Sequence, residues 1–161
     1  MTKPLLQKSL TESEMTMLAA ALAVLLVGGE CIALHGDLGA GKTTFARALI
    51  RALLNDPLHE VPSPTFSLRQ DYNGRCGPIV HFDLYRLVVP EELNELGFDD
   101  AVGAAITIIE WPERASDRLP LNRVEIALSE SDAPDKRQIS LSGSGSTYAT
   151  VACIARDYGA P

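Results

Sequence analysis

The segment over residues 36–43 constrains this chain more than any other part. Its sequence, GDLGAGKT, matches the pattern G-x-x-x-x-G-K-[ST]. The apolar residues 31–34 before it predict a buried strand, and residues 44–54 after it have the apolar spacing of a helix. A strand, a glycine-rich loop and a helix in this order form a phosphate-binding loop, so we expect the chain to bind a nucleoside triphosphate. A chance match in a glycine-rich turn is the alternative, and the flanking elements argue against it.

The chemistry of this loop assigns roles to its residues. Glycines let successive backbone N–H groups converge on phosphate oxygens, and the start of the following helix adds further unpaired N–H groups. Lys42 is expected to reach the β- and γ-phosphates, and the Thr43 hydroxyl is expected to ligate Mg²⁺. Asp37 is not required by the pattern and is expected at most to orient the turn. The residues expected to contact the nucleotide phosphates are Gly36, Asp37, Leu38, Gly39, Ala40, Gly41, Lys42, Thr43 and Thr44.

Charge, cysteine usage and hydropathy exclude several classes of protein. The 161 residues carry a formal net charge of −7, so an extended nucleic-acid contact by this chain itself is not expected, because phosphate backbones require a basic face. Cys31, Cys76 and Cys153 lie far apart and lack metal-site spacing. The apolar run over residues 18–27 is only about ten residues long, too short to span a bilayer. We therefore expect a cytoplasmic protein that makes no use of a membrane.

The remaining pattern alternates helices and strands. Thr11 and Glu14 have the spacing of a capping box at a helix start. The fold class expected is α/β, a P-loop NTPase fold with a central, mostly parallel sheet, flanking helices and an added antiparallel hairpin around residues 72–78. The predicted elements are helices over residues 11–27, 44–54, 90–96 and 147–158, strands over 31–34, 66–70, 79–83, 104–110, 124–128 and 138–142, and a flexible link over 143–146.

A phosphate loop usually works with a carboxylate from a neighbouring strand, which helps to hold Mg²⁺. Glu110 ends an apolar strand and is the better candidate, and Asp83 ends another; a surface acid after a strand is the alternative for both. Thr65 lies on a loop with two prolines and would either sense the γ-phosphate or begin a strand. Trp111 would either pack in the core or contact the nucleotide or a partner, and His81 is expected to be packed or on the surface rather than a ligand.

Four further blocks of sequence carry information: SPTF at residues 63–66, HFDLYRL at 81–87, EEL followed by LG over 91–97, and EWPER at 110–114. Together with the phosphate loop, in this order and spacing, they resemble the TsaE family, the small bacterial ATPases of tRNA threonylcarbamoyladenosine (t6A) synthesis. The second and fourth of these blocks are far more specific than the phosphate loop alone. The resemblance extends from about residue 10 to residue 143.

The resemblance implies a P-loop ATPase that binds ATP and Mg²⁺ and works with a heterodimeric threonylcarbamoyl-transferase (TsaB/TsaD-like). That complex modifies the adenosine beside the anticodon of tRNAs that read ANN codons, so tRNA would be contacted mainly through the partners. By resemblance, Thr43 and Glu110 would hold Mg²⁺, Asp83 would be needed for hydrolysis and Thr65 would belong to a switch-like loop. The adenine would lie against the start of the first helix; the residues implied there are Thr11, Glu12 and Arg137.

Two other functions remain open from the residues alone. A small-molecule kinase would use the same loop with an arginine-bearing lid, for which Arg114, Arg118 and Arg123 are candidates, although Pro112 and Pro120 and the short span argue against a lid. A nucleotide-binding interaction module would bind without useful turnover. In domain terms, residues 1–143 are expected to form the P-loop ATPase domain, and residues 144–161 a flexible link and a short C-terminal helix or tail.

Overall fold

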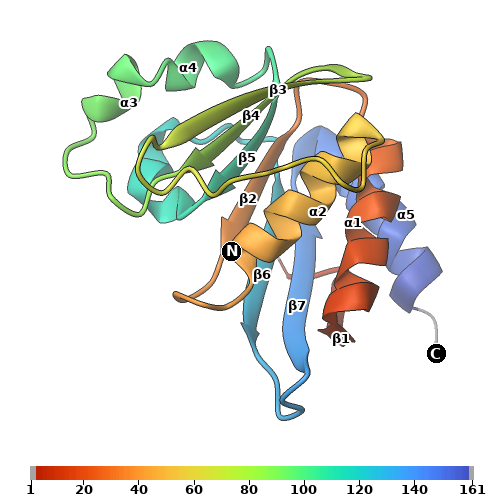
Figure 1. Cartoon of the computed structure of the whole chain (residues 1–161). Helices are drawn as coiled ribbons and strands as arrows, with labels where there is room; N and C mark the ends of the chain where they lie inside the picture. Colours follow the sequence, from red (N-terminus) through yellow and green to blue (C-terminus); the bar gives the residue numbers. More distant parts are fainter. Residues whose placement is uncertain (1–2, 160–161) are drawn as a thin grey trace.

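One sheet of seven strands organises the protein, in the order β1-β7-β6-β2-β5-β4-β3. This is a computed structural model, and it describes residues 3–159. Its central strands β6, β2, β5 and β4 run parallel, and β7, β1 and β3 pair antiparallel at the two sides (Figure 1). The strands are β1 (Leu6–Thr11), β2 (Cys31–His35), β3 (Arg69–Gly74), β4 (Gly77–Asp83), β5 (Ile106–Glu110), β6 (Val124–Glu130) and β7 (Lys136–Gly143). The helices are α1 (Glu12–Leu25), α2 (Lys42–Leu54), α3 (Glu92–Glu95), α4 (Phe98–Ala101) and α5 (Tyr148–Gly159), with short 3₁₀ segments η1 (Pro112–Arg118) and η2 (Gly145–Thr147). The predicted α/β class with a mostly parallel centre is confirmed.

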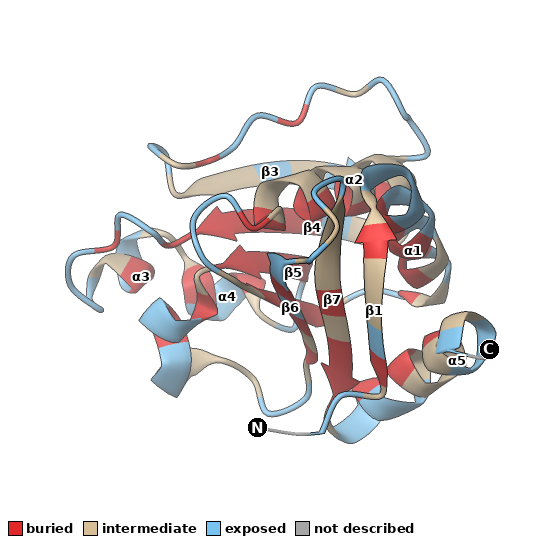
Figure 2. Ribbon diagram, turned by 90° about the horizontal axis from the view of Figure 1, so that it is seen from below, coloured by how far each residue is buried: buried red, intermediate tan, exposed pale blue. Residues whose placement is uncertain are grey.

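Helices cover both faces of the sheet and create two apolar cores. Alternate residues of a strand point to opposite faces, so Ile108 belongs to the core under α1, α2 and α5, whereas Ile109 belongs to the core under α3, α4 and η1. In Figure 2 the central strands β4 and β5 are buried almost throughout, and the edge strand β3 is only partly covered. Burial on both faces explains why the central strands read as continuous apolar runs rather than as alternating ones.

The carboxyl ends of the parallel strands meet at one edge of the sheet. The phosphate loop leaves β2 there, Asp83 ends β4 and Glu110 ends β5. The register places Glu110 directly beside Asp83 on one side and beside Leu34 on the other. Ligands of open α/β sheets bind outside this edge, so strand pairing alone brings the loop and both acids together.

Three of the observed elements differ from the predicted ones. The strand β1 was not predicted; Leu6 and Leu10 are its buried residues, and it exists because it pairs with β7, far along the chain. The strand predicted over residues 66–70 is wrong in position, because Phe66 is exposed in a turn and β3 starts at Arg69. The helix predicted over residues 90–96 is shorter, and Gly97, in a left-handed conformation (φ 66°), separates α3 from the unpredicted α4.

The first helix begins where it was predicted to begin. The Thr11 hydroxyl accepts a hydrogen bond from the Glu14 backbone N–H (3.2 Å), and the Glu14 carboxylate accepts one from the Thr11 backbone N–H (2.7 Å). This pair satisfies two N–H groups that a helix start leaves unpaired. Thr11 therefore ends β1 and caps α1 at once.

The segment predicted as a flexible link is held by hydrogen bonds. β7 continues to Gly143, and the Thr147 hydroxyl in η2 donates to the backbone carbonyl of Arg123 (2.7 Å). The helix α5 follows and buries Val151 and Ile154 in the same core as α1 and α2. The division of the chain at residue 143 stays a prediction. Within residues 3–159, no helix is long and apolar enough to cross a membrane.

We expect Phe98→Ala to lower the free energy of unfolding by about 3–5 kcal/mol, the usual cost of deleting a buried aromatic ring. Phe98 is fully buried and its ring centroid lies 5.1 Å from that of Phe82. The matched control is Phe66→Ala, because Phe66 is 83% exposed and the Arg86 guanidinium lies over its ring at 4.3 Å; it should cost at most about 1 kcal/mol. Urea unfolding followed by circular dichroism measures both, and equal losses would contradict this packing of α4.

Candidate functional site

The phosphate loop joins β2 to α2 through a backbone that only glycine adopts readily. Gly36, Gly39 and Gly41 have φ of 145°, 80° and 107°. A Cβ on Gly36 would lie 2.5 Å from the carbonyl oxygen of Leu128 at the end of β6, which leaves no space for any side chain. The Gly41 carbonyl accepts the first helical hydrogen bond, from the Phe45 N–H (2.9 Å). The loop therefore delivers the N-terminus of α2, with its unpaired N–H groups, to the edge of the sheet.

Lys42 is buried and turned back onto its own loop. Its Nζ donates to the carbonyls of Gly36 (2.5 Å) and Asp37 (2.8 Å). The same ammonium lies 4.1 Å from the centre of the Trp111 ring, a cation–π distance. Burial lowers the pKa of Lys42, and the nearby carboxylates, Glu110 foremost, oppose that shift. Lys42 is thus a desolvated cation at the mouth of the loop, poised to bind an anion.

The first residues of α2 reach the acids at the sheet edge. The Thr43 hydroxyl donates to Glu110 Oε1 (2.7 Å), and Asp83 accepts from the Tyr85 backbone N–H (3.0 Å). Burial raises the pKa of Asp83, and the adjacent charge of Glu110 raises it further. Burial also raises the pKa of Glu110. His81 and the Thr43 hydrogen bond outweigh this effect and hold the Glu110 pKa below its ordinary value. Glu110 is therefore the carboxylate of this pair that is more readily ionised.

His81 was expected to be packed or on the surface rather than a ligand, and it is fully buried beside Glu110. Its Nε2 lies 3.6 Å from Glu110 Oε2, and within residues 3–159 neither ring nitrogen has a hydrogen-bond partner. Strand alternation places His81 on the same face as Asp83, two residues later. The neighbourhood of His81 and Glu110 was not predicted. It depends on the parallel register of β4 and β5, which the sequence of either strand alone does not contain.

Thr65 reaches the site from the loop between α2 and β3. Its hydroxyl donates to Asp83 Oδ2 (3.2 Å) and lies 2.7 Å from the Ser63 hydroxyl. Thr65 lines the same hollow as the phosphate loop and does not begin a strand, since β3 starts at Arg69; its role as a γ-phosphate sensor stays a prediction. Ser63 was not singled out from the sequence as a site residue.

Trp111 closes the other side of the site. It has a left-handed backbone (φ 58°), unusual for a bulky residue, and its ring packs on Tyr85 at 4.8 Å between centroids. Trp111 lines the hollow at the phosphate loop and also packs, partly buried, against the core under α3, α4 and η1; a contact with the nucleotide or a partner stays a prediction. Tyr85 was not predicted as a site residue, although it lies two residues after Asp83.

These residues enclose two neighbouring hollows. The first has a volume of about 230 Å³ and is lined by Leu38, Gly39, Gly41, Lys42, Thr43, Thr44, Thr65, Asp83, Tyr85, Glu110 and Trp111. The second, of about 300 Å³, adjoins the other side of the loop and is lined by Glu12, Met15, Gly39, Gly41, Thr44, Pro134, Asp135 and Arg137.

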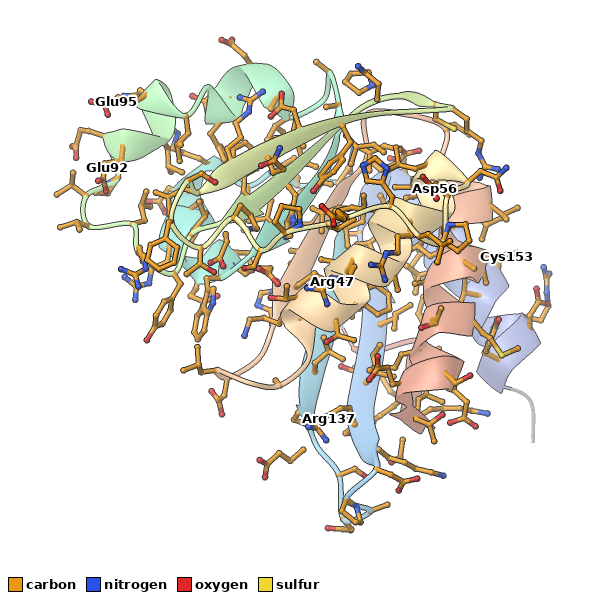
Figure 3. All side chains as sticks on the ribbon, viewed as in Figure 1. Arg47, Asp56, Glu92, Glu95, Arg137 and Cys153 are labelled. Carbon is orange, nitrogen blue, oxygen red and sulfur yellow. The ribbon has the colours of Figure 1, made fainter. Side chains whose placement is uncertain are left out.

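The second hollow contains two of the three residues that the resemblance implied for the adenine, whose role there stays a prediction. Glu12 and Arg137 line it, and Figure 3 shows Arg137 on β7 below the phosphate loop. Thr11 is not among its lining residues, since the Thr11 side chain is engaged in the helix cap. Met15 and Pro134, which offer apolar contact to a flat ring, were not predicted.

The donor set suits magnesium bound together with phosphates. No group of three or more His, Cys, Asp or Glu side chains in the described part of the chain forms a metal cluster by itself. Mg²⁺ in nucleotide sites commonly uses one or two carboxylates, with the remaining ligands from phosphates and water, and P-loop proteins add a hydroxyl. The Thr43–Glu110 pair, with Asp83 adjacent, matches that set.

The phosphate loop joins the central parallel strand β2 to the helix α2, and carboxylates end the neighbouring strand β5 and the next strand, β4. This arrangement defines a P-loop nucleotide-binding fold. The crystal structure of Bacillus subtilis YdiB superimposes with a TM-score of 0.74 and 27% identity, covering 98% of this chain and 97% of that one. The family model "Threonylcarbamoyl adenosine biosynthesis protein TsaE" matches residues 9–139. This chain belongs to the TsaE family.

Named relatives agree with that assignment. The tRNA threonylcarbamoyladenosine biosynthesis protein TsaE of Bacillus subtilis is 31% identical over 91% of this chain and 90% of its own length. The protein of the same name from Rickettsia conorii is 40% identical over 76% of this chain and 69% of its own. That from Aquifex aeolicus is 43% identical over 65% and 74%. The resemblance drawn from the sequence blocks is confirmed.

Proposed function

We propose that this protein is a Mg²⁺-dependent ATPase that acts in the cytoplasm with a threonylcarbamoyl-transferase heterodimer (TsaB/TsaD-like) in the t6A modification of tRNA. The observation that carries the proposal is the convergence of Lys42, Thr43, Asp83 and Glu110 on one hollow at the phosphate loop. Family membership supplies the pathway, since its relatives are named for threonylcarbamoyladenosine biosynthesis.

Binding of the triphosphate would use groups that the free protein already orients. The N–H groups at the start of α2 would donate hydrogen bonds to phosphate oxygens. The Lys42 ammonium would leave the carbonyls of Gly36 and Asp37 and bind the β- and γ-phosphates. Trp111 covers the Lys42 ammonium and limits the access of water to it. Thr43 and Glu110 would hold Mg²⁺, which neutralises charge on the β- and γ-phosphates.

Hydrolysis needs a group that orients the attacking water. Asp83 would take this role. It lines the hollow, and its Oδ2 accepts a hydrogen bond from the Thr65 hydroxyl. Its raised pKa makes it a stronger proton acceptor than an ordinary carboxylate. Glu110, held ionised by its neighbours, is better suited to the metal.

The kinase alternative lacks a free arginine lid. Arg118 binds Asp99 and the Asn94 side chain, Arg123 binds Glu125, and Arg114 donates to the Leu87 carbonyl. All three arginines are thus engaged at fixed points of the fold. No feature of the described residues favours a kinase over an ATPase.

The proposal is tested by measuring ATP hydrolysis by the protein alone and with the transferase heterodimer, with t6A formation on tRNA followed in parallel. Turnover and modification that both require the mixture support a partner-dependent ATPase. Turnover that ignores the heterodimer but rises with a small-molecule acceptor would establish a kinase. Nucleotide binding with negligible hydrolysis in every mixture would leave an interaction module.

We expect Lys42→Ala to reduce ATP turnover in the assembled complex by about 10²- to 10³-fold, the usual cost of removing one donor to developing charge. Lys8→Ala, on β1, is the matched control and should retain turnover. Steady-state phosphate release measures both variants. Retained turnover in Lys42→Ala would contradict the proposed role of Lys42 and its phosphate loop in ATP hydrolysis.

The metal role of Glu110 predicts a loss of Mg²⁺ dependence. In Glu110→Gln, the gain in affinity for a non-hydrolysable ATP analogue on adding Mg²⁺ should shrink by about tenfold or more, since even weaker changes around a metal cost 10- to 100-fold. Glu113→Gln, three residues later and exposed, is the control. Calorimetric titration with and without Mg²⁺ makes the comparison. A Gln variant with the full Mg²⁺ effect would contradict the role of Glu110.

The role of Asp83 predicts a separation of catalysis from binding. Asp83→Asn should lower kcat in the complex by about 10²- to 10⁴-fold, the range for a group that handles the proton of the nucleophile. The affinity for the nucleotide should change little, because Lys42 and the loop remain. The exposed Asp132→Asn is the control. If Asp83→Asn hydrolyses ATP at the normal rate, another group orients the water.

A further inference from the structure

A long connection without regular structure brings Thr65 to the site. It comprises residues 55–68, between the end of α2 and the start of β3. In Figure 1 it is the yellow segment that runs back across α2 toward β3. Loops of more than about twelve residues are uncommon in compact domains and usually serve a function. How this loop is held therefore bears on how Thr65 is held.

The middle of the loop has few backbone hydrogen bonds of its own. Its first turn is tied by Asp56, which accepts hydrogen bonds from the Leu58 N–H and the His59 ring, and its last turn by the Leu68 N–H bonding to the Pro64 carbonyl. Between these turns, no backbone–backbone hydrogen bond involves residues 60–63 in the described structure. Two of the positions nearby, 62 and 64, are prolines and have no N–H to donate.

Two arginines of α2 supply the missing bonds. Arg51 Nε donates to the carbonyl of His59 (2.9 Å), and Arg47 Nε donates to the carbonyl of Val61 (3.2 Å). Arg47 and Arg51 stand four residues apart, so they lie on one face of the helix. Figure 3 shows Arg47 on α2 and Asp56 near the end of that helix, with the loop passing in front. Val61 itself is buried in the core under α2.

The Val61 carbonyl, which Arg47 binds, is close in sequence to Thr65, whose hydroxyl contacts Asp83. Ser63 and Thr65 follow Val61 by two and four residues, and the Thr65 hydroxyl binds Asp83. Arg47 lies on the helix that starts with Lys42 and Thr43. The guanidinium thus connects the phosphate-binding helix to the loop that touches the hydrolytic carboxylate, without itself lining the phosphate hollow.

We propose that Arg47 is a positioning residue, which fastens the loop over residues 59–65 to α2 and so holds Thr65 against Asp83; Arg51 secures the start of the same loop. The inference rests on the proposed ATPase function only for its catalytic consequence. The Arg47 Nε carries a single N–H, and this N–H donates to one backbone carbonyl, that of Val61. No other group of the described residues binds the carbonyl of Val61.

The first test needs no nucleotide. In Arg47→Met, amide hydrogen exchange in a peptide that reports the Leu68 N–H, which bonds to the Pro64 carbonyl in the last turn of the loop (2.7 Å), should accelerate by about tenfold or more, the factor that corresponds to loss of a charge-assisted hydrogen bond. Arg75→Met is the matched control, since Arg75 Nη2 makes the same kind of bond to the Ala23 carbonyl at the end of α1. The control should leave this peptide unchanged. Unchanged exchange in Arg47→Met would overturn the anchoring role.

The second test measures catalysis in the complete mixture of protein, heterodimer and tRNA. Arg47→Met should lower kcat for ATP by about tenfold and change KM by less than about twofold, because the loop contacts Asp83 rather than the phosphate loop. Arg47→Lys keeps a donor and should recover part of kcat, which a merely destabilised fold would not do. Faster exchange with an unchanged kcat would overturn the link from Arg47 to Asp83.

The two proposals fail in different ways. If the wild-type mixture hydrolyses no ATP, the ATPase function is wrong, while the exchange experiment still decides whether Arg47 anchors the loop. If the wild type hydrolyses ATP and Arg47→Met alters neither exchange nor kcat, the anchoring role is wrong and the ATPase function stands.

Discussion

The pairing of β5 with β4 and β2 is the constraint on which the rest of the site depends. Because these strands are parallel, their carboxyl ends coincide, and Glu110 stands beside Asp83 at the point where β2 passes into the phosphate loop. The Thr43 hydroxyl then joins the first turn of α2 to Glu110 across this edge. A shift of one residue in β5 would turn Glu110 to the opposite face of the sheet. Such a shift would separate Glu110 from the Thr43 hydroxyl and from Asp83.

Neighbouring groups shift the pKa values of the two site carboxylates, Asp83 and Glu110, in opposite directions. Glu110 has His81 and Thr43 beside it and stays ionised, while burial and Glu110 itself raise the pKa of Asp83. Two adjacent carboxylates with unlike environments can take unlike roles, one at a metal and one at a proton. Lys42 balances them from the other side, under the ring of Trp111.

The sequence was most informative where the chemistry is local. The phosphate loop, the cap at Thr11 and the buried strands β2, β4 and β5 follow from short patterns, and Glu110 and Asp83 were identified because each ends such a strand. What escaped prediction depends on contacts between distant segments. β1 exists through β7, and His81 meets Glu110 only through the register of two strands. Phe66 was predicted at the start of a strand, although here it is exposed in a turn and β3 starts at Arg69.

The pairing of β1 with β7 also bears on how the chain folds as it is made. The strand β1 (Leu6–Thr11) is synthesised well before its partner β7 (Lys136–Gly143). The phosphate loop, α2, β4 and β5 are complete well before that, and domains begin to fold as their residues emerge. Until β7 arrives, β6 has an open edge and Leu6 has no strand to lie against. The pairing of β1 with β7 is therefore a contact of high sequence separation, and such contacts are expected to form slowly.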